Sequence, residues 1–140
     1  MIPNQELRPR GMAYLEQMFG DGAADALISD MDGLCPDFAS MSIEWALGGV
    51  ASRPGLDRVT RELVVIASCV TLGHPVLQLR AHTQAALRAG ATREQIIETI
   101  LQLLFYAGGA SVRNALVAVK DILNGVGVSE ASGSSGRPEG

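Results

Sequence analysis

Cysteine is scarce in this sequence of 140 residues, which contains Cys35 and Cys69 and no other. The two do not form a Cys-x-x-Cys pair, and no cysteine–histidine group has the spacing of a zinc site. Cys69 lies in a run that is apolar on all sides, which predicts a buried, unreactive thiol. We therefore expect neither a disulfide framework nor a metal site.

Positive charge is scarce too. Lysine and arginine number 11 against 15 aspartates and glutamates, so the formal net charge is −4. Proteins that bind nucleic acid usually carry a basic face, and no such partner is predicted. Lys120 is the single lysine. Nearly every cation is therefore an arginine, whose planar guanidinium suits carboxylates.

Long apolar runs are missing. None reaches the roughly 18 residues of a membrane span, and the N-terminus lacks the apolar core of a signal peptide. We expect a soluble, cytoplasmic protein without a membrane partner.

Strand-like alternation persists nowhere, whereas helical spacing recurs along the chain. This pattern predicts an all-α fold, a compact bundle of about six to seven helices. The expected domain covers residues 1–125, and residues 126–140 are expected to be a disordered polar tail. The expected helices cover about 8–19, 22–32, 36–48, 58–72, 76–89, 93–104 and 110–124.

Several helix ends carry recognisable signals. Asp57 is expected to cap the helix that follows the turn ASRPGLD (51–57), and Thr92 is expected to form a capping box with Gln95. The helix that begins at Cys35-Pro36 is expected to stop at Gly48-Gly49.

The stretch VLQLRAHTQAALRAG (76–90) places a histidine on an alanine-rich helix. At about 100° per residue, His82 shares a side with Gln78 and with small residues such as Ala85 and Ala89. Small neighbours permit either close packing or an open space. His82 is thus either a hydrogen-bonded core histidine or a residue facing a cavity.

The segment LLFYAGG (103–109) is apolar on every side, which indicates an interface between subunits. Tyr106 ends the apolar run, so its hydroxyl needs a partner, either a substrate or a neighbouring subunit.

Three segments carry a resemblance to a known family: RPGLD (53–57), LQLRAHTQAALRAGATREQIIETI (77–100) and YAGGASVRNAL (106–116). From Arg53 to Ala115 the chain resembles the carboxymuconolactone decarboxylase family, whose helical fold is shared with the alkylhydroperoxidase D proteins. The resemblance implies a homo-oligomer, trimeric or hexameric.

The peroxidase branch of that family has two cysteines seven and four residues before its histidine, where this chain has Pro75 and Gln78. Because peroxide reduction by that route requires a thiolate, peroxidase activity is not expected. The resemblance also places Glu62 near a carboxylate that serves a proton relay in that branch.

The decarboxylase branch usually has Glu-x-x-x-His, where this chain has Gln78 followed by His82. It usually has an aromatic residue just before the Arg-Pro-Gly turn, where this chain has Ala51. Glutamine cannot exchange a proton at neutral pH, so Gln78 is expected only to orient a group. Both differences indicate a substrate other than the muconolactone itself.

The catalytic residues predicted from these patterns and from the resemblance are His82 and Glu62. The predicted substrate-binding residues are Arg53, Gln78, Tyr106, His74 and Trp45. Each has a simpler interpretation. His82 can be a core histidine, Arg53 a solvent-facing or capping arginine, and Glu62 the partner of Arg61 in a surface pair. His74 can simply occupy the Gly-His-Pro break, and Trp45 can be core or pocket wall.

The function that the resemblance implies is a cofactor-independent decarboxylase that acts on a small lactone or keto acid through an enolate, with His82 as general acid or base. Two alternatives stay open. One is a cofactor-free cyclase or isomerase of a biosynthetic pathway. The other is a helical oligomer that binds a small acid without catalysis.

Overall fold

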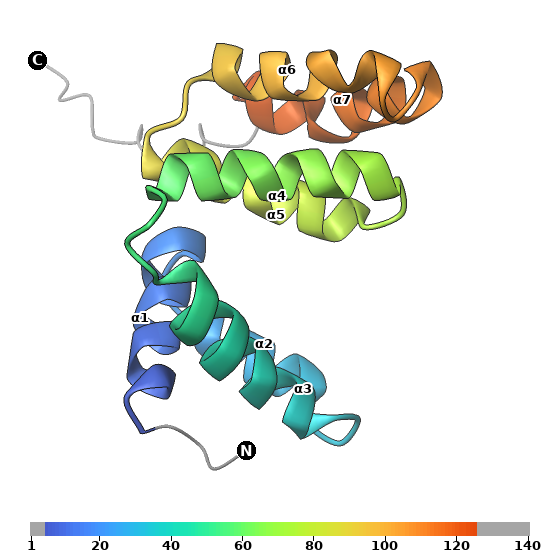
Figure 1. Ribbon diagram of the computed structural model, residues 1–140. Helices are drawn as coiled ribbons and strands as arrows, with labels where there is room; N and C mark the ends of the chain where they lie inside the picture. Colours follow the sequence, from blue (N-terminus) through green and yellow to red (C-terminus); the bar gives the residue numbers. More distant parts are fainter. Residues whose placement is uncertain (1–4, 126–140) are drawn as a thin grey trace, which may run out of the picture.

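The computed structural model describes residues 5–125, and the described chain is helical throughout, without a strand (Figure 1). The prediction of an all-α fold is confirmed. The elements in chain order are α1 (Leu7–Phe19), α2 (Ala23–Met31), α3 (Pro36–Met41), η1 (Ser42–Ala51), α4 (Arg58–Leu72), α5 (Val76–Ala89), α6 (Arg93–Leu101), η2 (Gln102–Phe105) and α7 (Gly109–Leu123). The tail expected at 126–140 lies outside the described residues.

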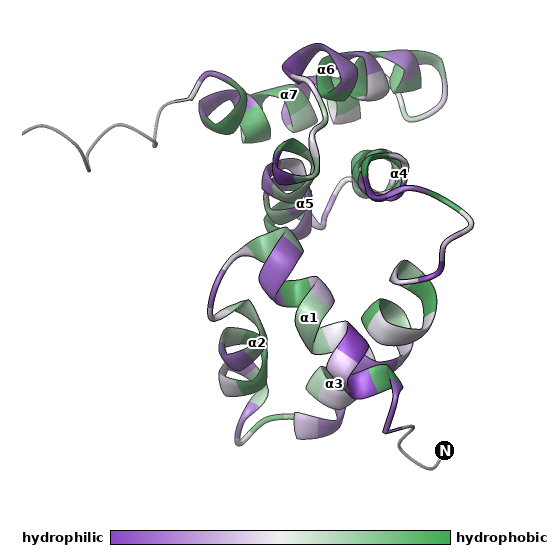
Figure 2. Ribbon diagram, turned by 90° about the vertical axis from the view of Figure 1, so that its left-hand side faces the viewer, coloured by the Kyte–Doolittle hydropathy of each residue, from purple (hydrophilic) through white to green (hydrophobic). Residues whose placement is uncertain are grey.

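The helices form two groups, stacked one above the other in Figure 1. Helices α4–α7 pack against one another in the upper group, and α1, α2, α3 and η1 form the lower one. Helix α1 joins the two groups, because it packs along η1 and also contacts α5, which stands directly above it in Figure 2. The candidate site lies at this junction.

Two of the three hydrophobic clusters among the described residues hold the upper group together and join it to the lower one. The upper group encloses fully buried branched side chains from α4, α6 and α7, among them Ile66, Ile96 and Val119. A second cluster joins Tyr14 and Met18 of α1 to Ala85 of α5. Because Ala85 is small, α1 approaches α5 closely at the point where the lower group meets the upper one.

The expected caps are present. The carboxylate of Asp57 accepts a hydrogen bond of 2.9 Å from the backbone nitrogen of Thr60 and begins α4. Thr92 and Gln95 form the predicted capping box at the start of α6. These bonds satisfy backbone N–H groups that have no partner within the helix, and so they determine where each helix starts.

The expected stop at Gly48-Gly49 is wrong. The helix continues to Ala51 with wider, π-type winding, in which the nitrogen of Ser52 bonds to the carbonyl oxygen of Leu47 at 3.0 Å. Gly48 lies against the backbone of Leu7 in α1, where a Cβ atom would collide with the carbonyl group. Gly48 therefore allows two helix backbones to approach closely instead of ending one of them.

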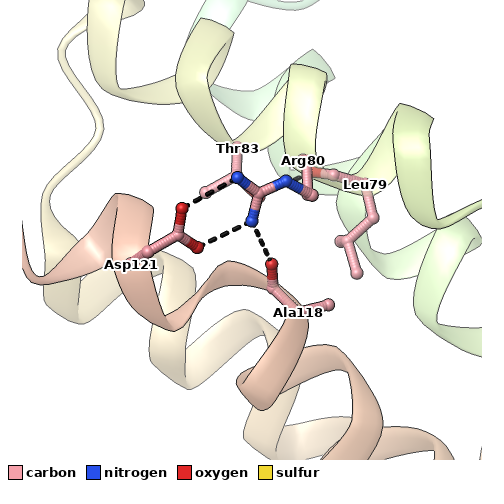
Figure 3. A network of polar contacts seen from close by, with 5 residues as sticks. All are labelled: Leu79, Arg80, Thr83, Ala118 and Asp121. Atoms are coloured by element: carbon pink, nitrogen blue, oxygen red, sulfur yellow. Dashed lines mark hydrogen bonds and ion pairs between the residues drawn. The ribbon is translucent and has the colours of Figure 1, made fainter. Parts of the chain in front are cut away.

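An ion pair fastens α5 to α7 (Figure 3). The guanidinium of Arg80 bonds to both carboxylate oxygens of Asp121, at 2.6 and 2.8 Å, and to the carbonyl oxygen of Ala118 at 2.6 Å. The hydrogen bonds from Arg80 lower the pKa of Asp121 to about 2. Since α5 carries His82, this clamp also helps to hold the candidate site in place.

Within residues 5–125, every helix is too short or too polar to span a membrane.

Candidate active site

Glu62 of α4 and His82 of α5 meet at the junction of the two helix groups. The Nδ1 atom of His82 lies 2.6 Å from Oε2 of Glu62. Glu62 is 2% exposed, whereas the His82 side chain keeps 22% of its surface open. The interpretation of Glu62 as a surface partner of Arg61 is wrong, because its carboxylate is buried against the imidazole.

The bonding partners of Glu62 indicate how the imidazole is oriented. An ionised carboxylate can only accept hydrogen bonds, so with Glu62 ionised Nδ1 of His82 carries the donated proton. The second ring nitrogen, Nε2, then remains for exchange with a bound molecule. The ring of Phe19 stands edge-on to the imidazole, with centroids 5.2 Å apart and planes at 87°. Phe19 therefore restricts rotation of the ring.

Tyr14 of α1 completes this arrangement. Its hydroxyl donates to Oε1 of Glu62 at 3.2 Å. Burial raises the pKa of Tyr14 to about 12, and the negative charge of Glu62 adds to the increase. The hydroxyl thus keeps its proton and remains a donor across the physiological range. Nothing local in the sequence identified Tyr14, because its partner lies 48 positions further along the chain.

A cavity of about 350 Å³ adjoins the pair. Glu62 and His82 line it, together with Arg61, Tyr14 and mostly apolar residues. The apolar part of the wall comprises Ala46, Leu47, Val50, Ala51, Leu56, Val64 and Val65. The π-type segment η1 supplies four of these residues, and such winding is frequent at functional sites. The arrangement offers a proton-exchanging nitrogen at the edge of an apolar chamber.

Among the described residues that line this cavity, Arg61 carries the one guanidinium group. Its Nη2 donates to the carbonyl oxygen of Arg53 at 2.8 Å. Its Nε is buried and has no hydrogen-bond partner among the described residues. A buried donor without a partner is costly, so the guanidinium is suited to an anionic oxygen in the cavity.

Arg53 lines a second cavity, of about 510 Å³, next to the first. Three residues, Tyr14, Ala51 and Leu56, belong to the walls of both cavities. Arg53 thus lies near the pair of Glu62 and His82 without sharing its chamber. Ala51 stands on the wall between the two cavities.

Four predicted binding residues lie away from both cavities. Gln78 and His74 are exposed, at the start of α5 and in the break before it. Trp45 is 42% exposed and Tyr106 is 84% exposed. In the single chain, none of them contacts His82 or Glu62 through a hydrogen bond or ring contact within residues 5–125.

Both cysteines are free thiols, with Cys35 exposed and Cys69 buried as predicted. Burial raises the pKa of the Cys69 thiol, which disfavours the reactive thiolate. Neither cysteine lines the cavity beside His82.

Several known proteins are similar to this chain in sequence. A sequence model of the carboxymuconolactone decarboxylase family matches residues 36–121, a span that contains both Glu62 and His82. A 4-carboxymuconolactone decarboxylase of Acinetobacter baylyi is 30% identical over 126 residues, covering 89% of this chain and 93% of that protein.

Two further relatives are similar over shorter spans. A nitrosuccinic acid decarboxylase of Metarhizium robertsii is 35% identical over 82 residues, which cover 58% of this chain and 56% of that protein. An uncharacterized 15.0 kDa protein of Paracoccus denitrificans is 34% identical over 95 residues, which cover 66% of this chain and 69% of that protein.

Proposed function

Because this chain belongs to the carboxymuconolactone decarboxylase family, we propose that it is a carboxy-lyase that removes CO₂ from a small acid, with His82 as the proton donor. The observation that carries the proposal is the contact of 2.6 Å between His82 and the buried Glu62 at the edge of a cavity. A histidine held by a carboxylate is a recurrent acid–base device. The space beside it also argues against a merely structural histidine.

The reaction we propose begins with a carboxylate β to a lactone or keto carbonyl. The bond between that carboxylate and the α carbon breaks, CO₂ leaves, and the electron pair moves into the carbonyl to form an enolate. His82, protonated on both nitrogens, then gives the proton on Nε2 to the α carbon. Water restores the lost proton. Glu62 stabilises the imidazolium through Nδ1, and Tyr14 holds Glu62 in place.

Two arginines serve this reaction in our proposal. Arg61, on the wall of the cavity, stabilises the developing enolate oxygen, because preorganised donors are most effective where charge develops. Arg53 holds an acid group of the substrate from the adjoining cavity. The apolar wall receives the leaving carboxylate, since an anion that is poorly solvated is lost more readily as neutral CO₂.

Gln78 and Tyr106, which the sequence predicts to bind the substrate, take that role in our proposal only from a neighbouring copy of the chain. Phe105 is 92% exposed in the single chain, and Leu101, Leu104 and Tyr106 beside it are exposed too. We propose that this surface is covered in a homo-oligomer, trimeric or hexameric. Analytical ultracentrifugation at micromolar concentration tests this, and a stable monomer would exclude it.

The proposed reaction is tested by measuring released CO₂ from 4-carboxymuconolactone, nitrosuccinate and simple β-keto acids. CO₂ release well above the spontaneous rate, dependent on enzyme concentration, is expected for at least one of them. Product formation without CO₂ would favour a cyclase or isomerase that uses the same histidine. Tight binding of these acids without any turnover would indicate a binding protein.

A further inference from the structure

The cavity beside His82 combines one group of polar side chains with a long aliphatic wall. Tyr14 and His82 both contact the carboxylate of Glu62, and Arg61 lines the same cavity. Every other lining residue is aliphatic, and we call this set the aliphatic wall: Ala46, Leu47, Val50, Ala51, Leu56, Val64 and Val65. Sites for small molecules typically pair such a wall with a few polar groups that fix the orientation of the ligand.

The winding of η1 explains how so many of its side chains reach one cavity. Ala46, Leu47, Val50 and Ala51 all line it. In an α-helix, side chains five residues apart point about 140° away from each other, because each residue turns the chain by about 100°. In the wider winding of η1 a hydrogen bond closes over five residues, as between Ser52 and Leu47, and both Ala46 and Ala51 face the cavity.

The larger side chains of the aliphatic wall are open to solvent in the single chain. Val50 is 59% exposed, Val64 is 57% exposed and Leu56 is 48% exposed. On the same helix as Val64, Ile66 is fully buried in the upper hydrophobic cluster, so the exposure is confined to the side of α4 that faces the cavity. Removing apolar surface from water is favourable, and an apolar group of a bound molecule would cover this wall.

The cavity is larger than the reacting group alone requires. Its volume is about 350 Å³. A cavity of about 150 Å³ lined by aliphatic side chains is sufficient to bind benzene. The space beside His82 therefore accommodates a carboxylate and, next to it, an apolar group at least as large as a benzene ring.

We propose that the aliphatic wall is a subsite for an apolar substituent, and that the substrate is a β-keto or lactone acid bearing an alkyl or aryl group. The inference rests on the proposed function for the reacting end of the molecule, which lies beside His82 and Arg61. The substituent lies along η1 and Val64. Ala46 and Ala51 are specificity-determining residues in this proposal, because their small side chains leave the room that the substituent occupies.

Binding of unreactive acids tests the subsite without turnover. Butanoate, hexanoate and octanoate carry the same carboxylate and differ only in the length of the alkyl chain. In calorimetric titrations each added CH₂ group is expected to tighten binding about two- to fourfold until the cavity is full, since complete burial of one CH₂ group corresponds to about fourfold. The same affinity for all three acids would overturn the proposal.

Variants locate the effect. Ala46→Leu is expected to fill part of the cavity and to reduce the preference for octanoate, with butanoate affinity little changed; Ala46 is exposed, so the fold tolerates the larger side chain. Val64→Thr keeps nearly the same shape and replaces a methyl group with a hydroxyl, so it is expected to weaken the preference without filling the cavity. Val117→Thr, at a valine of α7 that is 58% exposed and lies outside both cavities, is the matched control and is expected to bind as the wild type.

The outcomes separate this inference from the proposed reaction. A chain-length preference that persists in both Ala46→Leu and Val64→Thr, or that falls equally in Val117→Thr, overturns the subsite even if CO₂ is released. A preference weakened by at least one cavity variant and unchanged in Val117→Thr supports the subsite even if no acid is decarboxylated, in which case the proposed reaction alone fails.

Discussion

Nδ1 of His82 and Oε2 of Glu62 lie 2.6 Å apart, although the two residues belong to different helices and are separated by 20 positions in sequence. Glu62 is buried, and its other oxygen accepts a hydrogen bond from the hydroxyl of Tyr14. The carboxylate is thereby fixed from two sides, and the imidazole is presented to a cavity with one nitrogen engaged. The proposed role of His82 as the proton donor depends on this relationship.

Replacing Glu62 with glutamine tests the contribution of the carboxylate. The amide has nearly the same shape, but it carries no charge to stabilise the imidazolium and can present an N–H group to Nδ1. We expect kcat for CO₂ release to fall on the order of 10²-fold with KM little changed, because proton transfer is impaired while the binding wall persists. Steady-state kinetics measure kcat and KM separately. A raised KM at unchanged kcat would instead show that Glu62 only shapes the cavity.

The raised pKa of Tyr14 predicts that this residue ionises, and that the fold loses stability, only at strongly alkaline pH. Its pKa in the folded chain is about 12, against an ordinary value of 10.0, so the folded state holds its proton more tightly than the unfolded state does. The resulting stabilisation is complete below pH 10 and is lost as pH rises towards 12. The ultraviolet absorbance of tyrosinate, measured as pH is raised, is compared between the wild type and Tyr14→Phe, and the difference reports the ionisation of Tyr14. Ionisation of Tyr14 near pH 10 would contradict the buried bond to Glu62.

Gly48→Ala is expected to destabilise the fold by on the order of 1–3 kcal/mol, as overpacking does. The added methyl group would collide with the backbone of Leu7, which cannot move aside as a flexible side chain would. Gly55→Ala is the control, since a Cβ atom there meets open space. Urea unfolding measures both variants. A Gly48→Ala variant as stable as Gly55→Ala would show that α1 and η1 are not in backbone contact.

The ion pair between Arg80 and Asp121 predicts an acid-dependent contribution to stability. The folded pKa of Asp121, about 2, is below its ordinary value of 3.8, so the contribution is present above pH 3.8 and is lost as pH falls towards 2. Both side chains are partly exposed, so solvent reduces the effect.

We therefore expect Asp121→Asn to lower the melting temperature modestly at neutral pH and to match the wild type near pH 2. Asp30→Asn, at an exposed aspartate of α2, is the control and is expected to change little at either pH. A difference between Asp121→Asn and the wild type that is independent of pH would argue against the ion pair.

The sequence predicted what depends on neighbours along the chain. The caps at Asp57 and Thr92 were read correctly, because each is a bond to a residue three positions away. Gly48 was misread as a helix end, since its real constraint is the backbone of Leu7 in another helix. The periodicity of apolar residues indicates which side of a helix is apolar. It does not indicate which other helix packs its backbone against that side.

The residues of the candidate site also fall into those that the sequence indicated and those that only the tertiary structure reveals. His82 and Glu62 were named from a resemblance, and their contact required the packing of α4 against α5. Tyr14 was missed, and Arg61 was not among the predicted site residues, because their partners are set by tertiary structure. Gln78 shares a helix side with His82 in the sequence pattern, yet it is exposed at the beginning of α5, where the cavity does not reach.

The central claim is that His82 delivers the proton, and the most direct measurement is the CO₂-release rate of His82→Ala beside that of Gln84→Ala. Gln84 is exposed on the same helix and lines neither cavity, so it controls for changes to α5. We predict that both variants keep the helical circular dichroism of the wild type. Gln84→Ala should retain full activity, whereas kcat of His82→Ala should fall by roughly 10²- to 10⁴-fold and lose a limb of the pH profile. A folded His82→Ala variant with the activity and pH profile of the wild type would contradict the account.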